Sequence, residues 1–371
     1  MTPFEPHALP IQGLDYGRLI SLVGEANAAL ARYDGLLQTM VNPAVLLSSL
    51  TDQEAVLSSK IEGTQATLEE VLEHEAGQQH GERKTQDIRE VLNYRKALRF
   101  AQDTLAGRPL RLNLILQMHA ILLDSVRGEN KTPGEFRKDQ NWIGRAGCSI
   151  DEASYVPPNP FQLMDHLQAW EGYLTDNDFD VLAQTAIAHA QFELIHPFKD
   201  GNGRIGRLII PLVLFAKGRL SSPMFYLSAY LEAHRDEYYA RLQGISRESD
   251  WTGWIMFFLR AIIEQARDNA ARARQVMQLH DEMKGKVRDV TRSQHTAQLV
   301  DALFGRPIFQ AHDLAAWTDI PKPTVHLLIR QLQQEGILAV VRAPAGRRPA
   351  IYSFSRLLDI ADGKQPLTDS A

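Results

Sequence analysis

The chain has 371 residues, 44% hydrophobic and 23% charged, which predicts a globular protein of two or three domains and excludes collagen-like, disordered and disulfide-rich classes. Its 40 basic and 45 acidic residues give a net charge of -5, so the chain as a whole does not attract nucleic acid. No signal peptide or membrane-spanning apolar run is recognisable, and the single cysteine, Cys148, cannot form an internal disulfide. We therefore expect a cytoplasmic protein without membrane contact.

Apolar residues spaced three and four apart predict helices along most of the first 290 residues. One stretch differs: residues 128–160 are rich in Gly, Pro, Asn and aromatic residues and predict a long irregular segment or a short hairpin. Loops of this length in a compact domain are usually functional. The predicted helices lie within 14–105, at about 111–126, at 161–174, at 179–195, at 203–217, at 232–246 and at 251–283.

From about residue 295 the pattern changes to three short helices followed by two strands, ILAVV and AIYSF, around the basic loop RAPAGRR. A helix-turn-helix followed by a hairpin is typical of a winged helix. From residue 285 onward the chain carries eleven Lys and Arg against eight Asp and Glu, a balance of +3. We predict an N-terminal helical region (1–105), a catalytic core (106–270), a helical linker (271–290) and a winged-helix domain (291–360).

The chemistry is concentrated in one loop, HPFKDGNGR, at 196–204. A helix ends just before His196, and Gly201-Asn202-Gly203 opens the next helix, so free backbone N–H groups and the positive helix end favour an anion there. Arg204 and Arg207 lie three apart and can both reach phosphate oxygens. Asp200 offers an oxygen ligand of the kind Mg2+ takes together with substrate phosphates, and His196 can accept a proton at neutral pH.

The stretch HPFKDGNGRIGR resembles the signature of the Fic family, His-x-Phe-x-Asp/Glu-Gly-Asn-Gly-Arg-x-x-Arg, at every fixed position. PGEFRKDQNWIG (133–144) and YVPPNP (155–160) resemble the segments on either side of the family's flap, the hairpin that aligns the target. The resemblance implies a mainly all-α fold: a Fic helical core with a short β-hairpin flap, here followed by a small C-terminal winged-helix (α+β) domain.

The same resemblance implies a protein adenylyltransferase that uses ATP and Mg2+. His196 would take the proton from the target hydroxyl, which attacks the α-phosphate, while Asp200 would hold Mg2+. Phe198 would be the buried anchor of the loop. Tyr239 is expected to contact the nucleotide, although Tyr238 is almost equally eligible. The full set of expected nucleotide contacts is Gly201, Asn202 (also through its side chain), Gly203, Arg204, Ile205, Gly206, Arg207 and Tyr239.

Upstream, Ser58-Ser59-Lys60-Ile61-Glu62-Gly63 resembles the family's inhibitory motif, Ser/Thr-x-x-x-Glu-Gly/Asn. Its position before the core indicates the subclass with an N-terminal inhibitory helix, with Ser58, Glu62 and Gly63 as the motif residues. Glu62 would pair with Arg207 and so occupy the guanidinium that the γ-phosphate needs. In some relatives the same glutamate positions water for AMP removal, so the direction of the reaction stays open.

Two other readings remain. The protein could act chiefly as a DNA-binding regulator through its winged helix, or the scaffold could transfer a different group, such as phosphate or phosphocholine. The expected partners are ATP and a target protein with an exposed Ser, Thr or Tyr hydroxyl, with self-modification, a homodimer and DNA left open. The candidate DNA-contacting residues are Lys322, Thr324, His326 and Arg330 on the third helix and Arg342, Arg347 and Arg348 on the wing.

Overall fold

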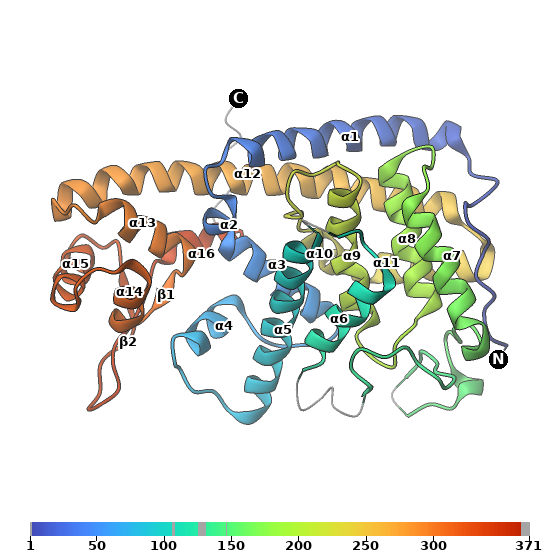
Figure 1. Cartoon of the computed structure of the whole chain (residues 1–371), viewed down its shortest axis with the longest axis horizontal. Helices are drawn as coiled ribbons and strands as arrows, with labels where there is room; N and C mark the ends of the chain where they lie inside the picture. Colours follow the sequence, from blue (N-terminus) through green and yellow to red (C-terminus); the bar gives the residue numbers. More distant parts are fainter. Residues whose placement is uncertain (1, 106–107, 125–130, 146, 365–371) are drawn as a thin grey trace. The chain divides into compact units, whose positions relative to one another are not determined.

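The computed structural model describes residues 2–105, 108–124, 131–145 and 147–364 and is built mainly from helices (Figure 1). The mainly helical fold predicted from the sequence is confirmed. The end of the helix expected at 111–126 includes residues outside this described part. The chain forms two compact units: the first comprises Met1–Gly35, Leu57–Thr64 and Leu92–Arg267, and the second comprises Leu36–Val56, Gln65–Val91 and Asp268–Ala371.

Four helices contribute residues to both units, namely α1 (Tyr16–Thr39), α3 (Ser48–Ile61), α5 (Glu82–Leu105) and α12 (Trp251–Thr291). The helices of the first unit alone are α6 (Leu112–Leu122), α7 (Leu163–Thr175), α8 (Val181–Ile195), α9 (Asn202–Ala216), α10 (Ser228–Ala233) and α11 (Arg235–Glu248), with the short 3-10 turns η2 (Ile150–Glu152) and η3 (Pro160–Gln162).

Helix α8 is central to the first unit. Nearly all of its residues are buried, as expected of a helix that is apolar on every side. Two buried tryptophans are hydrogen-bonded to it: the Trp170 and Trp254 indole N–H groups each donate to an α8 backbone carbonyl at 2.8 Å. A helix end that projects from such a packed centre can hold a loop in one place.

The predicted flap segment is irregular, with one antiparallel bridge, between Ile143 and Tyr155, instead of a longer ladder. The Tyr155 hydroxyl donates to the Leu194 carbonyl at 2.6 Å, which attaches the segment to the end of α8. Trp142 and Ile143 remain about 40% exposed, at 42% and 41%.

The second unit carries a three-stranded antiparallel sheet of order β1-β3-β2. The two-residue strand β1 and the last helix, α16, were not predicted from the sequence; the three helices from about residue 295 and the other two strands were. This element order is that of a winged helix, which stays a prediction. The elements are α2 (Pro43–Leu46), α4 (Leu68–Glu75), α13 (Thr296–Gly305), β1 (Ile308–Phe309), α14 (Ala311–Thr318), α15 (Lys322–Gln334), β2 (Ala339–Arg342), β3 (Ile351–Ser353) and α16 (Ser355–Ala361).

Helix α15 begins and ends as its sequence predicts. Pro323 lies in its first turn, where no backbone N–H is needed, and Gly336 follows its end with a φ of +66°. Within the described part of the chain, none of the helices combines the length and apolar character needed to cross a bilayer.

Candidate active site

The candidate site is the turn between α8 and α9. Asp180 caps the start of α8 by accepting from the Leu182 and Ala183 amides at 2.8 and 3.0 Å, and the helix ends at His196, whose φ is +49°. A positive φ at a residue with a side chain is uncommon and costs about 1 kcal/mol or more. Gly201 has a φ of +79° and leads into the N-terminus of α9. The strained backbone therefore presents the His196 side chain at the helix end.

Asn202 closes this turn. Its side-chain oxygen accepts from the Phe198 amide at 2.8 Å, and its side-chain nitrogen donates to the Phe198 carbonyl at 2.9 Å. Both polar atoms of the side chain are thus bonded within the loop, so its expected contact with phosphate stays a prediction. Phe198 itself is fully buried, which confirms the burial expected of an anchor.

Arg137, on the segment that leads into the flap, holds the loop from the other side. Its backbone amide donates to the Pro197 carbonyl at 2.9 Å, and its guanidinium donates to the His196 carbonyl at 3.0 Å and to the Pro158 carbonyl at 2.5 Å. Burial lowers the pKa of this guanidinium to about 10, which still leaves it charged at neutral pH. One buried arginine therefore joins the catalytic loop to both ends of the flap segment.

His196 lines a cavity of about 640 Å³. Burial lowers the pKa of its imidazole to about 4, and the Glu193 carbonyl and the carboxylates of Glu62 and Asp200 offset this only in part. The ring is therefore neutral at pH 7 and able to accept a proton. The cavity is also lined by Glu62, Trp142, Ile143, Gly144, Ser154, Tyr155, Glu193, Leu194, Gly203, Arg207, Arg235, Tyr238, Tyr239, Leu242, Gln243 and Ser246.

Asp200 is the expected metal ligand. Its carboxylate accepts from the Gly201 amide at 2.7 Å, lies 3.7 Å from an Arg204 nitrogen and is 44% exposed. Among the described residues, no group of three or more His, Cys, Asp and Glu could hold a metal ion. A single accessible carboxylate fits Mg2+ that takes its other ligands from water and substrate phosphates.

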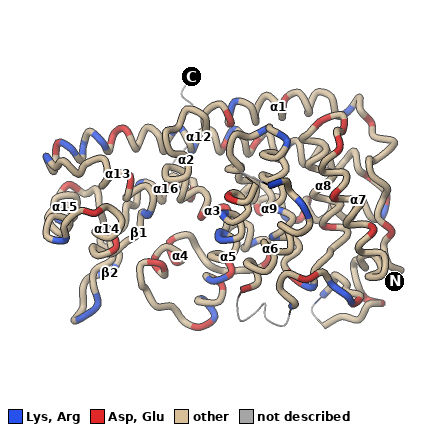
Figure 2. The backbone as a smooth tube through the Cα atoms, in the orientation of Figure 1, with Lys and Arg blue, Asp and Glu red and all other residues tan. Residues whose placement is uncertain are grey.

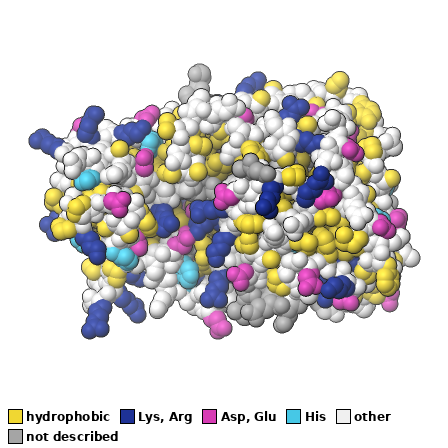
Figure 3. Space-filling model, viewed as in Figure 1, with side chains coloured by type: hydrophobic (Ala, Val, Ile, Leu, Met, Phe, Trp, Pro, Cys, Tyr) yellow, Lys and Arg dark blue, Asp and Glu magenta, His cyan; other side chains and the backbone are white. Residues whose placement is uncertain are grey.

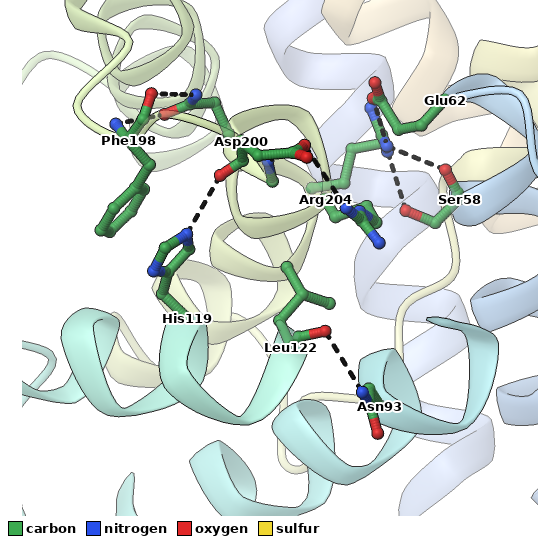
Figure 4. A network of polar contacts seen from close by, with 11 residues as sticks. Ser58, Glu62, Asn93, His119, Leu122, Phe198, Asp200 and Arg204 are labelled. Carbon is green, nitrogen blue, oxygen red and sulfur yellow. Dashed lines mark hydrogen bonds and ion pairs between the residues drawn. The ribbon is translucent and has the colours of Figure 1, made fainter. Parts of the chain in front are cut away.

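Arg207 is held by residues of the predicted inhibitory motif (Figure 4). Its Nη2 lies 2.8 Å from Glu62 Oε1 and donates to the Ser58 carbonyl at 2.8 Å, while its Nε donates to Ser58 Oγ at 2.8 Å. Burial opposes the ionisation of Glu62, but the charge and the hydrogen bond of Arg207 outweigh it and hold the pKa of Glu62 below its usual value. The pairing expected from the sequence is present.

Glu62 also reaches the start of α9. A Cβ added to Gly203 would lie 2.2 Å from Glu62 Oε1, so the carboxylate lies directly against this glycine. The N-terminus of a helix attracts negative charge. The carboxylate therefore occupies the position that the sequence predicts for a phosphate. Gly63 follows with a φ of +99°, and its amide donates to the Lys60 carbonyl at 2.9 Å, just after the end of α3.

The other residues predicted to contact the nucleotide differ in how far they are exposed to the cavity. Tyr239 is 38% exposed, whereas Tyr238 is buried and bonds through its hydroxyl to His189, so the cavity is open to Tyr239 more than to its neighbour. Ile205 is fully buried and its amide donates to the Gly201 carbonyl at 3.0 Å, so its expected contact with the nucleotide stays a prediction. Gly206 packs closely, because a Cβ there would lie 2.2 Å from Glu193 Oε1.

Sequence reasoning missed three polar residues around the loop: Arg137, Glu193 and His119. Glu193 lies three residues before His196, lines the cavity and has a buried Oε1 without a hydrogen bond. Burial raises the pKa of its carboxyl to about 8, with Arg207 lowering it and Glu62 raising it. His119 and Glu193 are polar residues within mainly apolar helical stretches, and that exception was the available signal; Arg137 lies in a polar, irregular stretch that gave no such signal.

A model of the Fic/DOC family N-terminal region matches residues 20–103, and a model of the Fic/DOC family matches residues 109–214, together about half of the chain. The chain belongs to the Fic/DOC family. The second match contains the whole 196–204 loop, and the first contains the predicted inhibitory motif, residues 58–63.

Among Fic relatives, the chain is 30% identical over 177 residues to "Protein adenylyltransferase Fic" of Aedes aegypti, which covers 45% of this chain and 31% of that protein. It is 28% identical over 195 residues to a probable protein adenylyltransferase of Aquifex aeolicus, covering 51% and 56%. The chain thus spans about a third to just over half of these relatives.

Two solved structures share the Fic fold. A Fic family protein from Desulfovibrio desulfuricans G20 superposes with a TM-score of 0.58 at 20% identity, covering 95% of this chain and 98% of that one. A Fic domain containing signaling protein from Bacteroides thetaiotaomicron has a TM-score of 0.52 at 18% identity, with 70% and 97% covered.

Proposed function

We propose that this chain is a protein adenylyltransferase that moves AMP from ATP onto a Ser, Thr or Tyr hydroxyl of a target protein, itself included. The proposal is supported by a neutral histidine beside a cavity, a glycine-opened helix N-terminus and two arginines in the first turns of that helix, in a chain whose relatives bear that name. The cavity volume of about 640 Å³ lies in the range of small-ligand sites.

In the proposed reaction, His196 accepts the proton of the target hydroxyl as its oxygen bonds to the α-phosphorus of ATP. The bond from the α-phosphorus to the bridging oxygen breaks, and pyrophosphate leaves. Asp200 would hold Mg2+, which when bound neutralises charge on the phosphates. The Gly201 and Gly203 amides and Arg204 would stabilise the developing negative charge. Arg207 would bind the γ-phosphate once it is released from Glu62.

The contact between Glu62 and Arg207 carries the regulatory part of this proposal. A buried charge that loses its partner is costly, so Arg207 needs either the carboxylate or a phosphate. Glu62 and the γ-phosphate would therefore compete for one guanidinium and one helix N-terminus. In the resting protein the carboxylate holds both, and we infer that ATP then binds unproductively.

The test uses ATP labelled at either the α- or the γ-phosphate, with Mg2+, and counts label on protein. The proteins compared are the natural chain, Glu62→Gly, and Glu62→Gly combined with His196→Ala. We expect α-label on the Glu62→Gly protein, about tenfold or more above the natural chain, because loss of one competing charge contact is worth about 1.5–3 kcal/mol. The His196→Ala combination should abolish it.

Other outcomes would identify the alternatives. Label from the γ-position would indicate phosphate transfer instead of AMP transfer. Loss of AMP from a protein labelled beforehand, dependent on Glu62, would favour removal of AMP as the main activity. Absence of α-label from Glu62→Gly with added candidate targets would contradict the proposed transfer.

A further inference from the structure

His119 lies in α6 and has no role in the reaction proposed above. Its ring is fully buried, and both ring nitrogens are hydrogen-bonded: the Gly134 amide lies 2.9 Å from Nδ1, and the Asp200 carbonyl lies 3.0 Å from Nε2. An amide can only donate, so Nδ1 must be the acceptor. The ring proton is therefore on Nε2 and is donated to the Asp200 carbonyl. Two neighbours thus fix the tautomer of this histidine.

The ring of His119 also packs flat on the catalytic loop. It stacks on Phe198 with the ring centres 3.7 Å apart and the planes 9° from parallel (Figure 4). A Cβ on Gly201 would lie 3.6 Å from the same ring and 3.2 Å from Leu122, the next turn of α6. Three residues of the loop, at 198, 200 and 201, therefore rest against one face of α6.

The second hydrogen bond connects His119 to the flap side. Gly134 has a φ of +76°, and a Cβ there would lie 3.1 Å from Ala120 and 3.3 Å from the Leu116 carbonyl, so only a glycine approaches α6 this closely. Three residues later, Arg137 bonds the loop backbone. His119 thus lies between the loop that carries Asp200 and the segment that leads into the flap.

We propose that His119 is a positioning residue: its Nε2–H fixes the Asp200 carbonyl, and thereby the direction of the Asp200 carboxylate, while its Nδ1 fixes the entry to the flap. The proposal rests on the proposed adenylyl transfer. The Asp200 carbonyl lies just before the first residue of α9, and the imidazole Nε2–H holds it from α6 at 3.0 Å. A misplacement of about 1 Å at a reacting group can cost about a hundredfold in rate.

The test separates the hydrogen bonds from the stacked ring. In the Glu62→Gly background, His119→Phe keeps an aromatic ring on Phe198 and removes both hydrogen bonds. His119→Gln removes the stack and keeps an amide donor near the position of Nε2. We expect His119→Phe to lower kcat about a hundredfold, to raise the Mg2+ concentration needed for half-maximal rate, and to change the KM for ATP less; His119→Gln should recover part of the rate.

A second readout does not depend on activity. Hydrogen exchange of peptides covering 196–203 and 133–137, without nucleotide, should be faster in His119→Phe than in its parent, because both segments lose a fixed contact. The matched control is His280→Phe, in the second unit. His280 is also buried, is bonded through Nε2 to Asp301 at 2.9 Å and packs edge-on against Phe304. The His280→Phe variant should leave kcat and the hydrogen exchange of both peptides at the parental level.

These readouts distinguish the two proposals. If the Glu62→Gly parent transfers no AMP, the proposed function fails, and the exchange of the two peptides still decides the role of His119. If His119→Phe has the same kcat, Mg2+ dependence and peptide exchange as its parent, the positioning role is overturned. If His119→Phe does not unfold cooperatively, the same comparison is made with His119→Leu, which also removes both hydrogen bonds, and parental exchange of both peptides in that variant would overturn the positioning role.

Discussion

Arg207 is bonded to acceptors from the last turn of α3 and the residue that follows it, within the predicted inhibitory motif. Besides the Glu62 carboxylate, Ser58 contributes both its hydroxyl and its carbonyl, each at 2.8 Å. The Ser58 contacts orient the guanidinium. Because Ser58 is uncharged, they do not replace a phosphate as the partner of its positive charge. The two residues should therefore contribute to inhibition unequally.

We expect Ser58→Ala to raise AMP transfer above the natural chain but to remain well below Glu62→Gly, because one hydrogen bond to a charged group is lost, worth about 1.5–3 kcal/mol, while the carboxylate remains. The measurement is initial rate of α-label incorporation. Ser59→Ala is the control, because Ser59 is equally buried and its hydroxyl has no hydrogen bond within the described part of the chain. Equal rates for the two variants would contradict a role for the Ser58 hydroxyl.

The buried carboxyl of Glu193 gives a pH dependence of stability. An ordinary glutamate has a pKa of 4.5, whereas burial raises that of Glu193 to about 8 in the folded protein. Between these values the folded state binds a proton that the unfolded state has released. The contribution of this group is therefore fully present below the unfolded pKa and is lost as pH rises to the folded value.

We predict that Glu193→Gln increases the melting temperature relative to the natural chain by an amount that grows from about pH 5 to about pH 8 and then levels off. Thermal unfolding across this range measures it. Glu248→Gln, at an exposed carboxyl of α11, controls for the loss of one negative charge. A difference that stays constant with pH, or shrinks as pH rises, would be inconsistent with a protonated Glu193.

At the scale of elements, α8 and α9 pack so closely that one glycine separates them. A Cβ on Gly206 would lie 2.2 Å from the Glu193 carboxyl and 3.3 Å from the His189 ring. Gly172 in α7 is a helical glycine with nothing within 4 Å of an added Cβ. Alanine substitutions at Gly206 and Gly172 therefore separate the effect of helix propensity on the free energy of unfolding from the effect of packing.

We expect Gly172→Ala to stabilise the protein by about 0.5–1 kcal/mol, since alanine favours the helix. Gly206→Ala should instead destabilise it by about 1–3 kcal/mol from overpacking, and should slow AMP transfer by displacing Glu193 into the cavity. Chemical denaturation gives both values. If both substitutions were stabilising, α8 and α9 would have to be less tightly packed than described.

The sequence predicted the elements better than their contacts. Periodicity and caps located α8, α9 and α15 to within about two residues, and the signature located the loop between the first two. Periodicity shows that one face of α6 is buried but not what it meets, so the bonds of His119 to residues 15 and 81 positions away could not be predicted. Strand β1, with two residues, is too short to show any alternation.

For the whole molecule, the open question is what the second unit binds. Lys322, His326 and Arg330 are all exposed, and their spacing of four places them on one side of α15. Arg347 and Arg348 are exposed on the loop between β2 and β3, where Figure 2 shows basic residues at the tip and Figure 3 shows basic side chains projecting.

Arg342 differs from the other candidate residues of the wing. Its guanidinium donates to the Gln78 side chain at 2.7 Å and to the Pro349 carbonyl at 3.0 Å. It is thus committed to bonds within the second unit and is a weaker candidate for DNA than the sequence indicated. Thr324 is half-buried on α15, so Lys322, His326 and Arg330 are the exposed members of the set that the sequence predicted on that helix.

If the second unit binds duplex DNA, we predict an affinity that falls as salt rises, because released counterions drive such binding. Arg347→Ala with Arg348→Ala should weaken binding and reduce the slope of log affinity against log salt by about 2, roughly one for each lost phosphate contact. Fluorescence anisotropy of a labelled duplex measures both, and α-label transfer by the same variant in the Glu62→Gly background should be unchanged.

Lys96→Ala with Arg99→Ala is the matched control for this experiment, since it removes the same charge from two exposed positions of α5 that belong to the first unit. If both double variants weaken binding equally, the DNA senses overall charge and not the wing. If duplex DNA does not bind even at low salt, the net charge of +3 from residue 285 onward is too small to attract the phosphate backbone. The exposed face of α15 would then be the surface for a protein partner.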